Sequence, residues 1–465
     1  MDKENSRRNI NKKPRQVNEK GSSKIGLIII FIILISLAIA FFVATRGREI
    51  DMTESNVLFT RDYELSTKSD FYTYGDNIFH TTKDSLVLLD ENGNEVWKDS
   101  FTMLYPVMRG DKNAVALAEK NGTKLRVYNE NGLLYKMEFE QSLITFTVNG
   151  MGYIGAVNKK DSDYELLVCN QQGEEIHKSV FVADEGIPTA VDISEDGSVL
   201  AVSFMNINNI KLTSNVTFYY IDGNKTESTE SGDGMFASEL FEDSMPVALR
   251  FLADNNCVAV MDNKLAFIDC DESEGVQKVE VPIGNSISYA CVNGDGTTAV
   301  AFGEPLLNAA ERLEKNTVIW YDSKGNKINE YKSRRDITGL YPGEDITVIA
   351  MNREFEAYGT GGGYIWSYTA VQDTSKVLPY NGKDKMLAVT PVKATLTRVG
   401  KGNRLKEIAP EDNATTPSAL EEATGAEATE AVTSVEETTL QEGTTEPSET
   451  NTVQAETQKQ EEVTQ

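Results

Sequence analysis

Residues 191–202 constrain the fold more than any other stretch of the chain. Val191 and Ile193 alternate with polar residues, as in a half-buried strand. Asp196-Gly197 follows, and this pair is typical of a tight turn because glycine tolerates a positive φ. The apolar run 199–202 completes the unit. We therefore predict a strand, a surface turn that carries Asp196, and an inner strand packed between neighbouring sheets.

This turn-then-strand unit recurs, so it is one copy of a repeat. Eight copies begin near Tyr74, Arg109, Asn149, Val191, Ala253, Asn293, Pro342 and Asn381. Most copies are followed by a β-rich segment that ends in an acidic or amide residue and a glycine, such as Asp90 and Gly93. This pattern between strands is a strong hairpin signal. Each unit thus predicts four antiparallel strands, repeated every 35 to 58 residues, which is typical of propeller blades.

The ends of the repeat region predict a closed ring. The last copy offers three strands, around Val377, 386–389 and 394–399, and residues 57–65 can supply the fourth. Sharing one blade between the two ends removes two open sheet edges. We therefore expect an all-β propeller over residues 57–403. Eight blades fit the repeat count, and seven is the alternative if one irregular copy is an insertion.

The N-terminal region predicts a membrane anchor. Residues 1–24 are polar and basic, and the 21 residues from Ile25 to Thr45 contain no charge. A helix of this length spans roughly 30 Å, the thickness of the hydrocarbon layer. Phe41 and Phe42 crowd the place where a signal peptide would be cleaved, so we expect an uncleaved transmembrane signal-anchor. The positive-inside rule then puts the basic arm in the cytoplasm and the propeller outside it, after a linker over 46–56.

The C-terminal region, residues 404–465, changes composition. Thr, Glu and Ala dominate, and from Ile408 onwards the sequence contains fourteen acidic residues and one lysine. Such a segment has too few large apolar residues to offset its ordering entropy. We predict a disordered acidic tail.

Composition also bounds the function. The formal net charge is −27, and the acidic body argues against nucleic-acid binding. Only two histidines are present, so few side chains could serve in a His-rich metal site or a Ser-His-Asp triad. Four cysteines are expected to be buried thiols, although Cys257 and Cys270 flank a predicted hairpin and could face each other.

Two insertions interrupt the regular spacing of the repeat. Residues 304–316 place Leu306, Ala310 and Leu313 on one stripe of a predicted short helix. Residues 226–243 form an acidic loop, in which Phe236 to Phe241 are predicted to make a helical turn.

One acidic segment is a candidate metal site. Asp269, Asp271, Ser273 and Glu280 stand at relative positions 1, 3, 5 and 12, as in a calcium loop. The glycine is at position 7 rather than 6, and a solvated acidic turn is the competing interpretation. A second segment, 359–363, is glycine-rich but matches no phosphate-binding motif, so we predict a turn between strands.

Residues 89–98 resemble the blade motif of quinoprotein-type (PQQ-like) propellers, in which a tryptophan four residues after a glycine docks between blades. Gly93 and Trp97 hold these positions, whereas Lys136, His177 and Asn329 hold the tryptophan position in other copies. Residues 193–202 look more like WD40-type blades. Over residues 57–400 the chain resembles membrane-anchored β-propeller proteins of Gram-positive bacteria. This resemblance extends to architecture and not to an active-site motif, so we expect no cofactor.

These features favour a non-enzymatic module without catalytic residues. We expect a membrane-tethered extracytoplasmic propeller that binds an envelope protein or polymer on a ring face or in the axial channel. One alternative is an enzyme that acts on envelope glycans or peptides through channel carboxylates. Another is a membrane-linked sensor.

Overall fold

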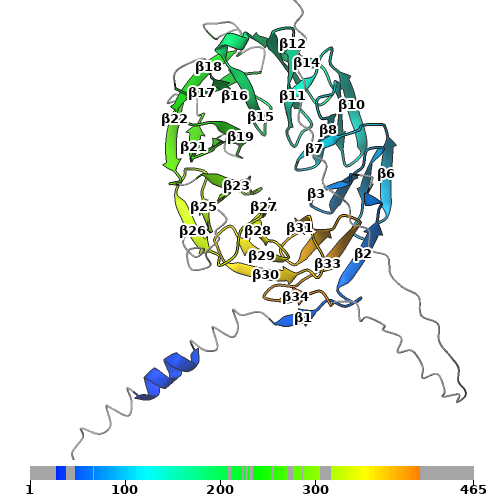
Figure 1. Ribbon diagram of the computed structural model, residues 1–465, viewed down its shortest axis with the longest axis vertical. Coiled ribbons are helices and arrows are strands. Elements are labelled where there is room, and N and C mark those ends of the chain that lie inside the picture. Colours follow the sequence, from blue (N-terminus) through cyan, green and yellow to red (C-terminus); the bar gives the residue numbers. More distant parts are fainter. Residues whose placement is uncertain are drawn as a thin grey trace, which may run out of the picture. The chain divides into compact units, whose positions relative to one another are not determined.

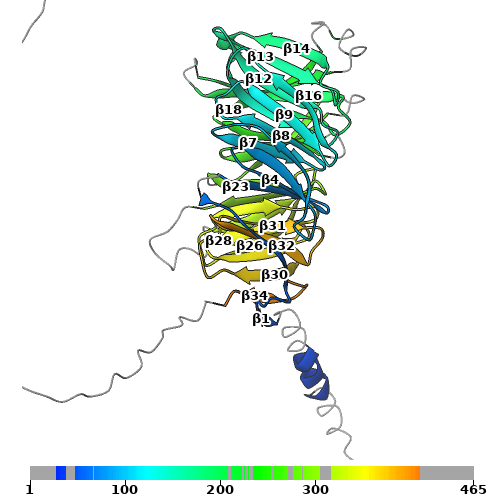
Figure 2. The same ribbon diagram turned by 90° about the vertical axis from the view of Figure 1, so that its right-hand side faces the viewer.

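A computed structural model of the chain describes residues 28–37, 48–65, 68–207, 211–221, 225, 229, 234–252, 256–270, 276–284, 286–303 and 316–408. The described residues form antiparallel sheets that stand side by side around an axis, as the blades of a propeller do (Figure 1). Figure 2 shows the same sheets from the side. Shared hydrophobic clusters join neighbouring blades around the ring, for example blades 3, 4, 5 and 6, counted in chain order. The predicted all-β propeller is confirmed.

Seven blades each contain four consecutive strands. Blade 1 contains β3 (Asp70–Tyr74), β4 (Asn77–Thr81), β5 (Ser85–Leu89) and β6 (Glu95–Ser100). Blade 2 contains β7 (Pro106–Asp111), β8 (Ala114–Glu119), β9 (Lys124–Asn129) and β10 (Gly132–Glu138). Blade 3 contains β11 (Leu143–Val148), β12 (Ile154–Lys160), β13 (Asp163–Cys169) and β14 (Glu175–Phe181). The 3-10 helix η3 (Ala183–Glu185) leads into blade 4, with β15 (Ile187–Ile193), β16 (Val199–Asn206), β17 (Thr213–Tyr220) and β18 (Met235–Glu242).

Blade 5 contains β19 (Pro246–Phe251), β20 (Cys257–Met261), β21 (Lys264–Asp269) and β22 (Gln277–Pro282). Blade 6 contains β23 (Ile287–Val292), β24 (Thr298–Phe302), β25 (Thr317–Tyr321) and β26 (Lys327–Lys332). Blade 7 contains β27 (Gly339–Pro342), β28 (Ile346–Met351), β29 (Glu354–Gly359) and β30 (Tyr364–Thr369). Blade 8 contains β31 (Lys376–Tyr380), β32 (Lys385–Val389), β33 (Lys393–Arg398) and β2 (Val57–Asp62). The described residues therefore hold eight sheets, the larger of the two predicted counts.

Blade 8 closes the ring with strands from both ends of the repeat region. The outer strand β2 pairs antiparallel with β33, in a register that joins Phe59 to Leu396 and Asp62 to Lys393. The predicted contribution of residues 57–65 to the last blade is thus confirmed. Phe59 also packs against Gly93 of blade 1, where a Cβ atom would lie 2.7 Å from its ring. The closing strand therefore contacts blades 8 and 1 together.

The core lies between the blades and not within a single sheet. Along β16, Val199 and Ala201 pack towards blade 5, while Leu200 and Val202 pack towards blade 3. All four side chains are buried, as expected for an inner strand with a neighbour on each face. The turn before it contains Gly197 at φ +70°, and the Asp196 carboxylate accepts hydrogen bonds from Ser194 and Ser198. Asp196 is therefore a turn residue, as predicted.

The tryptophan of the quinoprotein-like motif docks between two blades. Trp97 on β6 stacks on Tyr128 of blade 2, with ring centroids 5.8 Å apart. Its indole N–H donates to the carbonyl oxygen of Glu130 at 2.9 Å. This contact between blades 1 and 2 is the one that the resemblance implied.

Three predictions need correction. Residues Phe236 to Phe241 form part of β18 and not a helical turn, because seven of its residues pair with β17. The body also extends beyond 57–403 at both ends. β34 (Arg404–Lys406) adds to β30 in parallel, and β1 (Glu49–Asp51) adds to β34 in parallel. Each of these strands has three residues, which are too few to show an alternating pattern in the sequence.

Two further predictions fall largely outside the described residues. The helix expected over 304–316 is described only at Asn316. Of the predicted membrane anchor, residues 28–37 are described and are helical. Among the described residues, no helix reaches the combined length and hydropathy that a bilayer span requires.

Candidate functional site

The blades enclose an axial cavity of about 1010 Å³. Seven of the eight blades contribute to its walls through their innermost strand or through the turn that follows that strand. Representative turn residues are Gly75, Lys112, Glu195, Gly294 and Asn381. This volume lies at the upper end of the range of ligand pockets, which runs from about 300 to 1,000 Å³. The axis of the ring is thus the candidate functional site.

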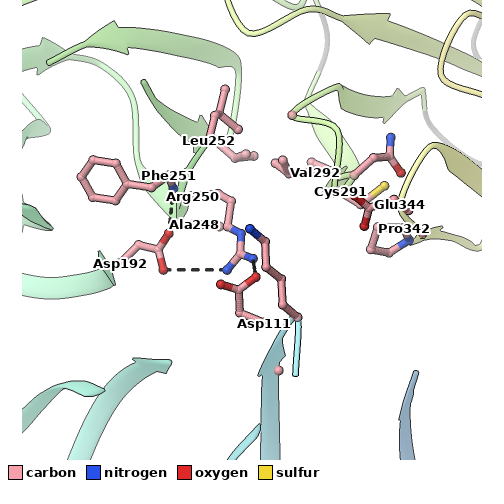
Figure 3. Close-up of a pocket in the computed structure, with 18 of the residues that line it drawn as sticks. Asp111, Asp192, Ala248, Arg250, Phe251, Leu252, Cys291, Val292, Pro342 and Glu344 are labelled. Atoms are coloured by element: carbon pink, nitrogen blue, oxygen red, sulfur yellow. Dashed lines mark hydrogen bonds and ion pairs between the residues drawn. The ribbon is translucent and has the colours of Figure 1, made fainter. Parts of the chain in front are cut away.

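A charged bridge lies across one side of this cavity (Figure 3). The Arg250 guanidinium on β19 pairs with Asp111 at the end of β7. Its second terminal nitrogen lies 4.0 Å from an oxygen of Asp192 on β15. One arginine of blade 5 therefore meets carboxylates of blades 2 and 4. We name Arg250, Asp111 and Asp192 the bridge.

Backbone and hydroxyl donors hold Asp192 in place. Its carboxylate accepts hydrogen bonds from the Thr147 hydroxyl at 2.6 Å and from the Phe251 amide at 2.7 Å. Burial raises the pKa of Asp192, while Arg250 and these donors act in the opposite direction. Burial also opposes the charge of Arg250, but Asp192 and Asp111 outweigh it and raise the Arg250 pKa. Asp192 and Arg250 thus each favour the charged form of the other.

A second ion pair runs beside the bridge. The Lys112 ammonium, in the turn after β7, pairs with Glu195 in the turn after β15. In addition, Arg109 donates to the carbonyl oxygen of Phe146 on β11, and its guanidinium lies 5.0 Å from the centre of the Phe146 ring. These contacts join blade 2 to blades 3 and 4. The bridge and its neighbours therefore fix the relative positions of the inner strands.

The predicted calcium-type residues are only partly placed. Asp269 ends β21 and Glu280 lies on β22, whereas Asp271 and Ser273 fall outside the described residues. The Glu280 carboxylate accepts a hydrogen bond from Lys264 at 2.9 Å and lies 3.5 Å from Lys278. Within the described residues, no group of three or more His, Cys, Asp or Glu side chains could hold a metal ion. The candidate site stays a prediction.

The four cysteines are free thiols. Cys169, Cys257 and Cys270 are buried, as predicted, whereas Cys291 is partly exposed and lines the axial cavity. Burial raises the pKa of Cys291 to about 12, so its thiol stays protonated at neutral pH. It is therefore a poor nucleophile in this setting.

The sequence did not single out any member of the bridge. Asp111 ends the first strand of a repeat, and Asp192 and Arg250 each lie one residue before such an end. Their shared position in the repeat was a usable signal, because equivalent positions of a propeller converge on one axis. The pairing between them, over 58 to 139 chain positions, was not readable from any local pattern.

A comparison with protein-family models identifies the family of this chain. The model described as "Family of unknown function (DUF5711)" matches residues 48–397, which is three quarters of the chain. The chain belongs to this family. The match begins beside β1 and ends in β33, so the DUF5711 region coincides with the propeller. None of the curated proteins matches this DUF5711 chain.

Solved structures with a similar arrangement include propellers from bacteria and fungi. BamB from Moraxella catarrhalis is 10% identical with a TM-score of 0.45, and the alignment covers 74% of this chain and 99% of BamB. Sqt1 from Chaetomium thermophilum is 9% identical with a TM-score of 0.46, and the alignment covers 76% of this chain and 99% of Sqt1. We draw no functional conclusion from these two likenesses.

Proposed function

We propose that this chain is a membrane-tethered, extracytoplasmic binding or scaffold module that holds an envelope protein or polymer in or over its axial cavity. The observation that carries the proposal is the cavity itself. Its walls come from seven blades, so a bound partner would contact a rigid, closed scaffold. Rigid scaffolds that present turns and loops at one site are typical of binding modules.

The charges of the cavity support binding more than catalysis. A glycosidase-type mechanism needs two carboxylates that are free to act on the substrate. The carboxylates of Asp111 and Asp192 instead share Arg250, and Glu195 is paired with Lys112. Such internal pairing stabilises the walls and leaves these acids poorly placed to transfer protons. The envelope enzyme is therefore the weaker hypothesis.

Blocking the cavity tests the proposal. Ala248 is exposed on the cavity wall, so Ala248→Trp places a large side chain in the cavity. Glu138→Trp, on the exposed outer strand β10, is the matched control. We expect cross-linked, solubilised membranes to yield one specific envelope component with wild type and Glu138→Trp, and its loss with Ala248→Trp. Equal recovery with all three proteins would contradict binding at the cavity.

Turnover and topology have tests of their own. Hydrolysis of a cell-wall fragment that is lost in Asp111→Asn would favour the enzyme instead. For location, Ser100→Cys introduces a thiol at an exposed position of β6. An impermeant maleimide should label this thiol in intact cells. Labelling only after permeabilisation would place the propeller inside the cell and reject the extracytoplasmic proposal.

A further inference from the structure

The charged groups of the axial cavity do not balance. Six acids line it, against the two cations Lys112 and Arg250. Both cations are already paired, Lys112 with Glu195 and Arg250 with Asp111 and Asp192. An anionic ligand would therefore have to break an existing ion pair to find a counter-charge.

The remaining acids differ in how they are satisfied. Asp345 pairs with Lys383, and Asp262 accepts a hydrogen bond from the Met245 amide at 2.8 Å. Glu344, in the turn after β27, is exposed and makes no ion pair or side-chain hydrogen bond with any other described residue. Among the described acids of the cavity, Glu344 is thus the one whose carboxylate has neither an ion pair nor a side-chain hydrogen bond, so it is available to a ligand.

The surroundings of Glu344 suit a cation. Tyr74, in the last position of β3, lines the same cavity. Burial raises the pKa of Tyr74, and the carboxylate of Glu344 adds to this shift. A carboxylate and an aromatic ring that line one cavity can attract ammonium and guanidinium groups through charge and cation–π contact. Gly294 leaves the space that Glu344 occupies, since a Cβ atom there would collide with this carboxylate.

The other end of the cavity carries exposed apolar side chains next to Asp262. Met245, Val247 and Tyr289 line it and remain 38%, 56% and 39% exposed. They lie before or near the starts of β19 and β23, whereas Glu344 lies in a turn that follows an inner strand. About five residues of strand separate these levels, or about 17 Å at a rise of ~3.3 Å per residue. Large apolar side chains left exposed in a cavity indicate a partner that covers them.

We propose that the axial cavity binds a short, extended peptide segment with an apolar side chain at one end and a lysine or arginine at the other. The apolar side chain lies against Met245, Val247 and Tyr289, and the cation pairs with Glu344 in the cavity that Tyr74 also lines. This inference rests on the proposed binding function and names the chemistry of the partner. A segment of about five extended residues matches the separation between the two ends.

The test uses the full chain in detergent, immobilised, with pools of acetylated and amidated pentapeptides. Each pool has leucine at one end, mixed residues in the middle and lysine, norleucine or glutamate at the other end, in both orders. We expect at least tenfold greater retention of the lysine pool than of the norleucine or glutamate pool. The preference should weaken when ionic strength rises, because salt screens a partly exposed pair.

Two variants decide which residue is responsible. Glu344→Gln keeps the shape of the side chain and should abolish the preference for lysine. Glu138→Gln, an exposed acid on β10, should leave it unchanged. Equal retention of the lysine and norleucine pools by wild type, or an undiminished preference in Glu344→Gln, would overturn the inference. Loss of the envelope component in Ala248→Trp, combined with either result, would leave the proposed function standing while this inference fails.

Discussion

At the residue scale, His80 makes stability depend on pH. The side chain is 3% exposed, its ring stacks on Phe71 at 4.3 Å, and its Nε2 atom lies 3.0 Å from the Ser69 hydroxyl. Burial, with a smaller contribution from Arg61, lowers the pKa of His80 from 6.5 to about 4. The folded state therefore favours neutral histidine. Its stabilising contribution is complete above pH 6.5 and is lost as the pH falls through about 4.

His80→Phe tests this dependence, because phenylalanine keeps the stacked ring and cannot be protonated. Between pH 7 and pH 4.5, the free energy of unfolding of wild type should fall by about 2–3 kcal/mol more than that of the variant. Urea unfolding at both pH values measures the difference. Other titrating groups are common to both proteins and cancel in the comparison. Identical pH profiles would show that His80 is protonated without cost in the folded protein.

The same scale shows what the sequence could and could not predict. Trp97 was recognisable because its distance from Gly93 is part of a blade motif, and Asp196 because its turn is local. Glu344 and Arg250 were not, although both lie near the end of an inner strand. A repeat predicts which positions converge on the axis, but the charge pairs depend on side chains from different blades. Only the assembled ring shows that Arg250 is paired, whereas Glu344 has no side-chain partner among the described residues.

At the element scale, β34 connects the N-terminal strand to the ring. β1 pairs with β34, and β34 pairs with β30 of blade 7. The Met52 amide donates a hydrogen bond to the backbone carbonyl oxygen of Lys406 at 2.7 Å. The Arg404 amide donates to the backbone carbonyl oxygen of Arg48, also at 2.7 Å. Leu405 is 1% exposed and belongs to the core cluster that contains Trp366. Residues 404–406 therefore hold the segment that leads towards the predicted anchor.

Truncation tests this connection. A chain that ends at Asn403 lacks β34, whereas a chain that ends at Ile408 keeps it and is the matched control. We expect the first truncation to abolish hydrogen-exchange protection of the Met52 amide. It should also lower the free energy of unfolding by about 2–3 kcal/mol, the value of one buried leucine. Retained protection at Met52 after loss of β34 would mean that β1 has another attachment.

These short elements also show which strands could not be predicted from the local sequence. Residues 236–241 contain Ala, Glu and Leu, which favour helices, yet pairing with β17 makes them a strand. β1 and β34 are three residues each and exist only because an edge of blade 7 is available. Long periodic strands were predictable from local pattern, while elements fixed by a distant partner were not.

At the scale of the whole molecule, stability depends on closing the ring. Each blade shares its core with two neighbours, so an open ring would expose a hydrophobic face on each side of the break. β2 prevents this by completing blade 8 while Phe59 contacts Gly93 of blade 1. Without β2, strand β33 would present an unpaired edge. The first strand of the propeller should therefore matter far more than its six residues suggest.

Deletion of residues 57–62 puts this to the test, with deletion of 49–51 as the control because β1 lies outside the closure. We expect the first deletion to broaden the urea transition and to cause self-association in sedimentation experiments, since the free edge of β33 can pair with another chain. The control should keep the cooperative transition of wild type. A synthetic peptide covering residues 55–64 should restore cooperativity to the first deletion by occupying the vacant edge. If the deletion variant unfolds as cooperatively as wild type without the peptide, the contacts between blades are enough to close the ring, and β2 is not needed for closure.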